Sequence, residues 1–156
     1  MTDSLYERDP FAWSQEQAAA LRAPGSNSID YENVAEEIES VGVSIRRACT
    51  SQIKNIIEHL LKLEFIGPEE AALHWRKEVN AFRHELADDL TPSLAAQLPA
   101  ELDGLYAKVR RALVTDALLE GRRLDLPEEN PYAWADVLGR DDELWFPEPR
   151  YSEPAA

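Results

Sequence analysis

Three long stretches of the chain carry apolar residues at spacings of three and four. This spacing gathers side chains on one face of an α-helix, and it predicts helices over 31–64, 69–90 and 100–120. The apolar positions are Val34, Ile38, Val41, Ile45, Ala48, Cys49, Ile53, Ile56, Leu60 and Leu63; Trp75, Val79, Phe82, Leu86 and Leu90; and Leu102, Leu105, Tyr106, Val109, Leu113 and Ala117. No segment shows the two-residue alternation of a half-buried strand.

Proline and glycine mark the ends of these helices. Gly67 and Pro68 are placed to stop the first helix, and Gly121 to end the third in a left-handed turn. Ser28 or Asp30 can cap the start of the first helix, because a side-chain oxygen satisfies the free amides of a first turn.

A five-residue formula that occurs twice predicts two shorter helices. In Asp9-Pro10-Phe11-Ala12-Trp13 and in Asn130-Pro131-Tyr132-Ala133-Trp134, an Asx residue is placed to cap a helix and proline to occupy its first position. The first helix should end near Arg22 and the second near Leu138. Shared capping chemistry explains the similarity of the two segments more simply than an internal repeat does.

The lengths of the predicted helices pose a packing question. At 1.5 Å per residue, a helix over 31–64 is about 51 Å long and one over 69–90 about 33 Å. Either the long helix breaks near Gly42-Val43-Ser44, or its excess length packs on the terminal arms or on a second subunit. The apolar stripe keeps its phase through Val41 and Ile45, which favours the arms or a second subunit.

Together these elements predict an all-α fold. We expect a helical bundle of three long helices, with shorter flanking helices and aromatic terminal segments packed across it. A chain of 156 residues has the usual size of one domain. Residues 1–150 are expected to form that domain, and residues 151–156 a disordered tail.

The net charge of −14 is carried by the two ends of the chain. Residues 1–42 contain 2 basic and 9 acidic side chains, residues 43–124 contain 12 of each, and residues 125–156 contain 2 and 9. Nucleic acids and anionic lipids are bound through Lys and Arg, so this composition argues against both as partners. Acidic ends favour a basic protein partner. The excess length of the helix over 31–64 favours a homo-oligomer.

The same ends hold most of the aromatic residues, which favours arms docked on a core with their rings inward. The chain begins without a basic start or an apolar run, its lone Cys49 cannot form an internal disulfide, and no stretch approaches the ~20 apolar residues of a membrane span. We therefore expect a cytoplasmic protein. The terminal aromatics are Tyr6, Phe11, Trp13, Tyr31, Tyr132, Trp134, Trp145, Phe146 and Tyr151.

The first half of the long helix, which reads Asp30-Tyr-Glu-Asn-Val-Ala-Glu-Glu-Ile-Glu-Ser-Val-Gly42, resembles the signature of a bacterial family, domain of unknown function 29. Other positions agree in order and approximate spacing: Tyr6, Asp9, Ala12-Trp13, Arg46-Arg47, His59-Leu-Leu-Lys62, Trp75-Arg76, Arg83, Pro131-Tyr-Ala-Trp134 and Trp145-Phe-Pro147. The resemblance covers nearly the whole chain. It implies an all-helical, stand-alone protein and no particular activity. The chain departs from the family in its turn Leu63-Glu-Phe-Ile-Gly-Pro-Glu-Glu70, where an aromatic-rich, basic segment is expected.

Four residues form the candidate cluster of the sequence: Glu37, His59, Arg76 and Arg83. Glu37 lies on the flank of the apolar stripe, so it is the member of the acidic group Glu32, Glu36, Glu37 and Glu39 expected to be partly buried. Arg76 and Arg83 project on one side of the second helix. Either of them can form a bidentate pair with Glu37, or the two can receive an anionic ligand. The acidic group is otherwise a solvated face near a helix N-terminus or, less simply, a metal or catalytic site.

His59 lies at the edge of the stripe. It can act in proton transfer, ligate a metal, or bond to a neighbour at the boundary of the core, and the last is the simplest interpretation. His74 and His84 are expected to face solvent. No Glu-x-x-His, nucleophile elbow or phosphate-binding loop occurs, so no metal and no cofactor are expected.

The sequence therefore leaves the biochemical activity unknown and favours a protein that is not an enzyme. The leading hypothesis is a protein-interaction or self-associating module without catalysis. The alternative is a small enzyme or ligand-binding protein whose site joins the four candidate residues in a crevice of the bundle.

Overall fold

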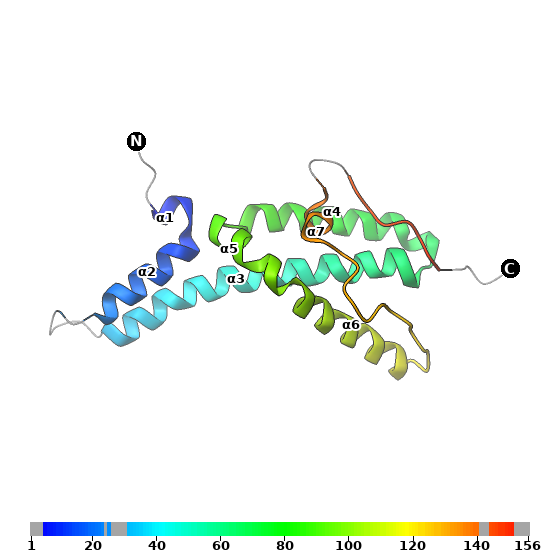
Figure 1. Ribbon diagram of the computed structural model, residues 1–156, viewed down its shortest axis with the longest axis horizontal. Helices are drawn as coiled ribbons and strands as arrows, with labels where there is room; N and C mark the ends of the chain where they lie inside the picture. Colours follow the sequence, from blue (N-terminus) through cyan, green and yellow to red (C-terminus); the bar gives the residue numbers. More distant parts are fainter. Residues whose placement is uncertain (1–4, 24, 26–30, 141–143, 152–156) are drawn as a thin grey trace.

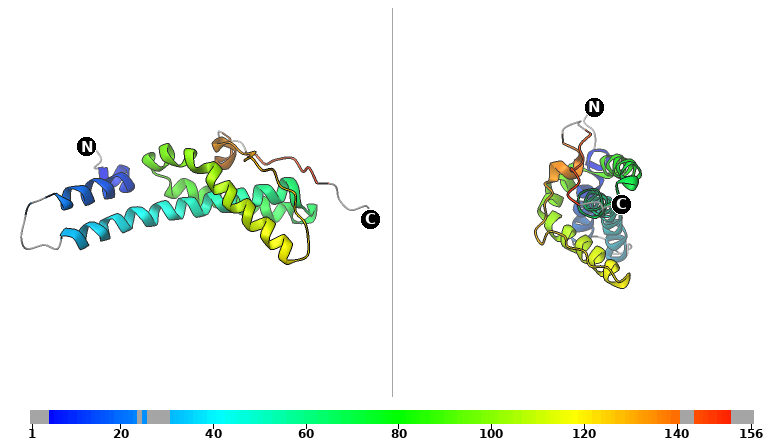
Figure 2. Two further views of the ribbon diagram at one scale, coloured as in Figure 1. Left: turned by 60° about the horizontal axis from the view of Figure 1, so that its bottom comes forward. Right: turned by 90° about the vertical axis from the view of Figure 1, so that its right-hand side faces the viewer.

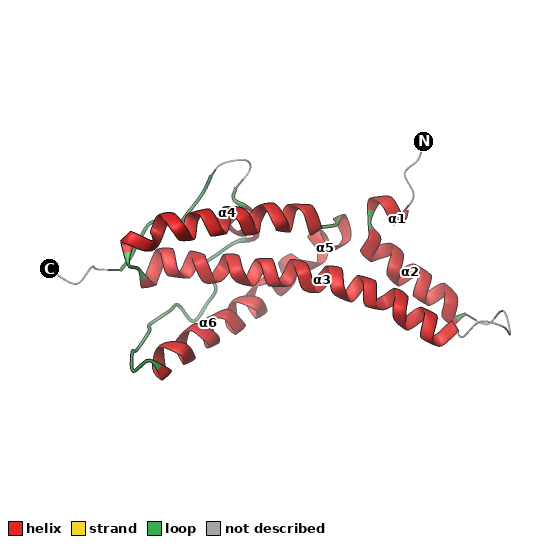
Figure 3. Cartoon of the chain, turned by 180° about the vertical axis from the view of Figure 1, so that it is seen from behind, coloured by secondary structure: helices red, strands yellow, loops and turns green. Residues whose placement is uncertain are grey.

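The computed structural model describes residues 5–23, 25, 31–140 and 144–151 of the chain. These residues form α-helices joined by loops, turns and short 3₁₀ and π-helical segments, with no strand among them (Figure 3). The all-α prediction is confirmed. Within the same described residues, no helix is long and apolar enough to cross a membrane.

The longest helix, α3 (Tyr31–Leu61), is the spine of the molecule (Figure 1). It passes through Gly42 without a break and continues into a π-helical turn, η1 (Lys62–Ile66). Gly67 ends this turn with φ of 67°, and the following Gly67–Pro68 peptide bond is cis. The predicted stop at Gly67 and Pro68 is therefore confirmed.

The two halves of α3 have different partners (Figures 1 and 2). Helix α2 (Pro10–Arg22) runs back along the N-terminal half, with the short α1 (Leu5–Arg8) at its start. Helices α4 (Ala72–Asp89) and α6 (Leu102–Leu119) pack on the C-terminal half. The N-terminal arm thus covers the part of the long helix that extends beyond α4 and α6. We call the pair of α2 and the first half of α3 the hairpin.

Small residues bring the two helices of the hairpin together. Ala18, Ala35 and Gly42 are buried between them. A Cβ atom built at Gly42 would lie 2.3 Å from Ser14 Oγ, closer than any contact can be. Glycine, which costs helix stability elsewhere, is used here for close packing of helix against helix.

The main core lies around the C-terminal half of α3. Ile53, Ile56, Ile57, Leu60 and Leu61 are fully buried there. They contact buried side chains from α4, α6, and the segments between and after these helices, among them Val79, Leu86, Leu94, Leu98, Leu105, Tyr106, Val109, Leu126 and Val137. Cys49 is part of this core, and burial raises the pKa of its thiol.

Two polar residues connect the base of the hairpin to the bundle. Asp9 caps α2 by accepting a hydrogen bond from Ala12 N at 3.0 Å, as the sequence predicts. The same carboxylate accepts bonds from Ser93 N at 2.7 Å and Ser93 Oγ at 2.8 Å in α5 (Pro92–Gln97). Helix α5 leads through a 3₁₀ turn, η3 (Leu98–Glu101), into α6.

The chain returns over the bundle after α6. Gly121 adopts φ of 75° and closes α6 with the paired hydrogen bonds Gly121 N to Leu118 O and Arg122 N to Ala117 O, which confirms the predicted left-handed end. Tyr106 Oη and Arg110 Nε of α6 donate hydrogen bonds, at 2.6 and 2.8 Å, to the carbonyl oxygen of Pro127 in the returning segment. These bonds hold the returning segment on α6.

Helix α7 (Trp134–Leu138) starts later than the repeated formula predicts. Asn130 does not cap it. Instead, Asn130 Oδ1 accepts from Tyr132 N at 3.0 Å in a local turn, and Asp136 satisfies the free amide of Ala133 at 2.9 Å. The formula fails because an Asx residue followed by proline also suits a turn. Gly139 ends α7 with φ of 102°.

Residues 144–151 run alongside α3 and α4, and we call them the strap (Figure 1). Tyr151 lies over Gly67, where a Cβ atom would approach the tyrosine ring to 2.6 Å. The proposed caps Ser28 and Asp30 lie outside the described residues, as do residues 152–156 of the expected tail 151–156.

Candidate functional site

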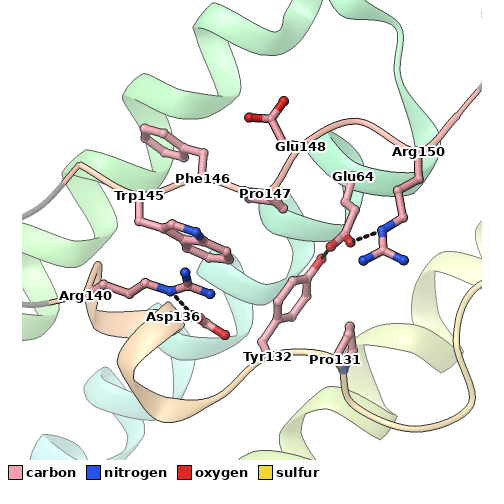
Figure 4. Close-up of a pocket in the computed structure, with 10 residues that line it drawn as sticks. All are labelled: Glu64, Pro131, Tyr132, Asp136, Arg140, Trp145, Phe146, Pro147, Glu148 and Arg150. Atoms are coloured by element: carbon pink, nitrogen blue, oxygen red, sulfur yellow. Dashed lines mark hydrogen bonds and ion pairs between the residues drawn. The ribbon is translucent and has the colours of Figure 1, made fainter.

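A pocket of about 420 Å³ lies between the end of α3, α7 and the strap (Figure 4). We call it the strap pocket. Three carboxylates, two guanidiniums and a wall of aromatic and proline side chains line it. The lining residues are Glu64, Pro131, Tyr132, Asp136, Arg140, Trp145, Phe146, Pro147, Glu148 and Arg150.

Glu64 is the buried carboxylate of this pocket, with 5% of its surface exposed. It lies in the π-helical turn η1, a type of turn that is frequent at functional sites. Its Oε2 atom accepts a hydrogen bond from Tyr132 Oη at 2.9 Å, and its Oε1 atom lies 2.8 Å from Arg150 Nε. Arg150 N also donates to the carbonyl oxygen of Glu64 at 2.6 Å. Glu64 therefore joins three segments of the chain.

Tyr132 stays protonated in this environment. Burial raises the pKa of its phenol far above the ordinary value of 10, and the adjacent Glu64 carboxylate raises it further. Its hydroxyl therefore acts as a hydrogen-bond donor to Glu64 at any physiological pH.

Arg83 of α4 fastens the C-terminal segment to the bundle. Its guanidinium, 8% exposed, donates to the carbonyl oxygens of Asp136, Val137 and Trp145 at 2.7, 3.0 and 2.9 Å. Two of these carbonyls belong to the end of α7, where a cation also interacts favourably with the helix dipole. Burial lowers the pKa of Arg83 to about 10, so the group remains charged at neutral pH.

Arg140 is held against Trp145. Its Nε donates to Asp136, and its guanidinium carbon lies 4.1 Å from the centre of the indole ring. Arg140 has φ of 52°, a left-handed conformation that costs a side-chain-bearing residue on the order of 1 kcal/mol. Such strain is found at sites where the fold must aim a side chain.

The second exposed feature is an apolar groove of about 470 Å³ on the hairpin. It is lined by the apolar side chains Trp13, Val34, Ile38 and Val41 and by Glu37. We call it the hairpin groove. Val34 is 38% exposed and Val41 45% exposed, and Tyr6 extends the apolar surface through an edge-on ring contact with Trp13 at 4.8 Å.

The pair that was expected between Glu37 and an arginine of the second helix is not formed. Glu37 is exposed, and Arg83 is used by backbone carbonyls. The reason is the register of the two helices. Glu85, near the end of α4, accepts a hydrogen bond of 2.5 Å from Gln52 of α3, and Gln52 lies about 22 Å beyond Glu37 along α3. Helix α4 does not reach the hairpin.

His59 is a boundary residue bonded to its neighbours. Its Nδ1 lies 2.8 Å from the carbonyl oxygen of Asn55, and its Nε2 lies 2.6 Å from Glu78 Oε2. His74, which is exposed, contacts the other oxygen of Glu78 at 3.4 Å. His59 lies about 33 Å along α3 from Glu37, so these two candidates cannot share one crevice. Among the residues described, no three His, Cys, Asp or Glu side chains converge in a group that could hold a metal ion.

Arg76 is exposed on α4, and its guanidinium carbon lies 5.8 Å from the ring centre of Phe146. Arg83 approaches the same ring at 5.3 Å. Arg76 and Arg83 therefore both contact the strap through Phe146, but neither of them lines the strap pocket.

The sequence contained a signal for the strap pocket that the helical pattern alone did not use. Glu64 lies four residues after Leu60 and three after Leu61, so it falls on the buried face of the long helix. A single carboxylate on such a face must find a donor or a cation. The partners Tyr132 and Arg150 could not be named from the sequence, because they follow Glu64 by 68 and 86 positions.

The fold and the strap pocket define an all-helical protein built on one long helix. The first half of this helix pairs with α2 in the hairpin, and its second half packs in the bundle with α4, α6 and the strap. Residues 5–143 match the family model of domain of unknown function DUF29, and the chain belongs to that family. A search of curated proteins finds no match. The fold is shared with an α-helical protein of unknown function from Rhodospirillum rubrum, whose crystal structure is 24% identical and has a TM-score of 0.70, with 92% of this chain and 94% of that chain covered.

Proposed function

We propose that this protein is a non-catalytic interaction module whose hairpin groove binds a basic, amphipathic segment of another protein. The observation that carries the proposal is the apolar floor of the groove, where Val34 and Val41 are 38% and 45% exposed on α3. A floor of this kind accepts the apolar anchors of a partner helix.

The charge of the hairpin indicates the chemistry of the partner. Residues 1–42 carry 9 acidic and 2 basic side chains, and Glu36 and Glu37 are exposed on the hairpin. Arg22, one of the two basic residues, is paired with Glu39. Lysine or arginine residues that flank the apolar face of a partner would therefore find complementary charge. Two copies of the hairpin would bring like charges together, which disfavours self-association through this groove.

The alternative of a small enzyme that uses Glu37, His59, Arg76 and Arg83 together has no geometric support. Glu37 lies on the hairpin, His59 is bonded on both ring nitrogens, and Arg83 is bonded to three carbonyls. A ligand-binding role would have to use other residues.

A pull-down with matched variants tests the proposal. Val34→Asp places a charge in the groove, whereas Val43→Asp places the same charge on the opposite side of α3, at a residue that is 51% exposed. We expect a stoichiometric partner that the wild type and Val43→Asp retain, that Val34→Asp loses, and that high salt releases. The segment of the partner protected on binding should be basic and amphipathic.

Two results would overturn the proposal. One is a partner that binds Val34→Asp as well as it binds the wild type, or no partner for any of the three proteins. The other is a wild-type dimer in light scattering that Val34→Asp converts into a monomer, because the groove would then be occupied by a second copy of this chain.

A further inference from the structure

The outward side of α6 carries an inference that does not rest on the proposed function, because the hairpin contributes no residue to it. Helix α6 crosses α3 at an angle, and its C-terminal end projects away from the spine of the molecule (Figures 1 and 2). The side of α6 that faces the core carries its buried side chains, Leu102, Leu105, Tyr106, Val109 and Ala117. The other side is open to solvent.

Six exposed residues recur at spacings of three and four along this open side, and we call them the α6 stripe. They are Lys108, Arg111, Ala112, Thr115, Leu118 and Leu119. Leu118 is 58% exposed and Leu119 is 83% exposed. The stripe holds two cations and no acidic residue, so it combines apolar anchors with positive charge in a protein of net charge −14.

The acidic residues of α6 lie outside the stripe. Asp103 accepts a hydrogen bond from Asn130 Nδ2 at 3.0 Å. Asp116 and Glu120 line a pocket of about 230 Å³ together with Glu58 of α3. The stripe therefore lacks the alternation of acidic and basic residues that is typical of a solvated helix face.

The returning segment leaves the leucines of the stripe uncovered. It is held on α6 where Tyr106 and Arg110 donate to the carbonyl oxygen of Pro127. Arg110 and Leu119 are nine positions apart, which is about two and a half helical turns, so they lie on opposite sides of α6.

The range of electrostatic forces decides which kind of partner suits the stripe. At physiological ionic strength the attraction of a charge is largely screened beyond about 8 Å. A narrow segment that touches only the stripe is attracted by Lys108 and Arg111. A membrane, a nucleic acid or a second copy of the chain has a broader surface, which would also approach many acidic side chains of a protein with net charge −14. The stripe therefore fits a single acidic segment.

We propose that the α6 stripe binds an acidic, amphipathic helix of a partner protein. Apolar side chains at one end of that helix pack on Leu118 and Leu119, and carboxylates at its other end pair with Lys108 and Arg111. Lys108 and Leu119 are about 16 Å apart along the axis of α6, so about three turns of the partner helix span the stripe.

Titration of the full-length protein with a designed helical peptide tests the proposal. The peptide is about four turns long and carries leucines at one end of one face and glutamates at the other end. A control peptide has lysine at each glutamate position. We expect the acidic peptide to bind with a dissociation constant below about 1 mM and to shift the backbone amide NMR signals of Leu118 and Leu119, whereas the control peptide leaves these signals unchanged.

Variants assign the binding to the stripe. Leu119→Asp should weaken binding of the acidic peptide by about 10-fold or more, because it places a like charge among the apolar contacts. Leu73→Asp makes the same change at a leucine of α4 that is 64% exposed, and it should leave binding unchanged. The double variant Lys108→Gln with Arg111→Gln should weaken binding by about 3-fold or more and reduce its dependence on salt. Circular dichroism confirms that each variant is folded.

Several outcomes would overturn the inference. One is an acidic peptide that leaves the signals of α6 unchanged, and another is an equal loss of binding in Leu119→Asp and Leu73→Asp. A wild-type dimer in light scattering that Leu119→Asp converts into a monomer would assign the stripe to a second copy of the chain. Capture of the wild type by anionic phosphatidylserine vesicles, lost in Leu119→Asp, would assign it to a lipid surface.

Failure here and failure of the hairpin groove are distinguishable. The variant Val34→Asp should bind the acidic peptide as tightly as the wild type does, because Val34 lies in the hairpin and not on α6. Loss of the acidic peptide in Val34→Asp would place that peptide in the hairpin groove and would contradict binding at the stripe.

Discussion

The guanidinium of Arg83 donates a hydrogen bond to the carbonyl oxygen of Trp145 at 2.9 Å, across 62 positions of sequence. The same guanidinium also donates to the carbonyl oxygens of Asp136 and Val137, so one buried cation positions both α7 and the strap. Gly139 leaves room for it, since a Cβ atom there would lie 3.4 Å from Arg83 Nε.

Replacement of Arg83 by lysine should therefore destabilise the protein although the charge is kept. An ammonium group cannot reproduce the planar fork that reaches three carbonyls, and we expect the free energy of unfolding to fall by about 2–4 kcal/mol. Denaturant titration measures the change, and limited proteolysis should show earlier cleavage in the strap. Arg76→Lys, at an exposed position, is the control. Equal stability of Arg83→Lys and the wild type would contradict the role assigned to Arg83.

Tyr132→Phe should destabilise the protein at neutral pH by about 1–3 kcal/mol, because Glu64 Oε2 loses its donor inside the protein. The double variant Tyr132→Phe with Glu64→Met should recover part of this loss, since it removes both members of the buried pair. Chemical denaturation of the four proteins in the cycle measures the coupling between the two residues. Additive effects would show that the hydrogen bond contributes nothing specific.

The raised pKa of Tyr132 predicts an alkaline limit to stability. The stabilisation is fully present below the unfolded pKa of about 10 and is lost as the pH rises above it, because only the unfolded chain releases the proton. The difference in stability between the wild type and Tyr132→Phe should therefore narrow above pH ~10. Absorbance of tyrosinate at alkaline pH should show that Tyr132 ionises only with unfolding. A constant difference across the pH range would refute the prediction.

Asp9 predicts an acid limit at the other end of the molecule. Burial raises the pKa of its carboxyl, but the hydrogen bonds from Ala12 and Ser93 outweigh burial and leave the pKa below its ordinary value. A lowered folded pKa contributes stability that is present above the unfolded pKa of about 4 and is lost as the pH falls through the folded value. The advantage of the wild type over Asp9→Asn in melting temperature should therefore be largest near neutral pH and vanish in strong acid. An advantage that persists in strong acid would assign the effect to shape and not to charge.

Gly42→Leu should separate α2 from α3, because Ser14 occupies the space that any side chain at this position would need. We expect a loss of about 1–3 kcal/mol in the free energy of unfolding and faster hydrogen exchange in α2. Gly104→Leu is the matched control. Gly104 lies in α6 with open space around it, so there the same substitution should stabilise by up to about 1 kcal/mol through helix propensity. Similar effects of the two substitutions would show that close packing at Gly42 is unimportant.

The sequence by itself determined the helices and most of their ends. The stop at Gly67, the left-handed end at Gly121 and the cap at Asp9 all depend on groups within a few residues of each other, so local chemistry decides them. The same reasoning failed at Asn130, because an Asx residue before proline satisfies a turn as readily as a helix start.

Only the tertiary structure decided which face of α3 is buried in the hairpin. The apolar stripe predicted Val34 and Val41 inward, yet Ala35 and Gly42 are the buried positions and the two valines are exposed. The reason is that two helices in close contact require small side chains, and hydrophobic spacing does not register size. Tertiary structure likewise brought Glu64 to Tyr132 and Arg83 to Trp145, since partners separated by more than 60 positions are chosen by the path of the chain and leave no local trace in the sequence.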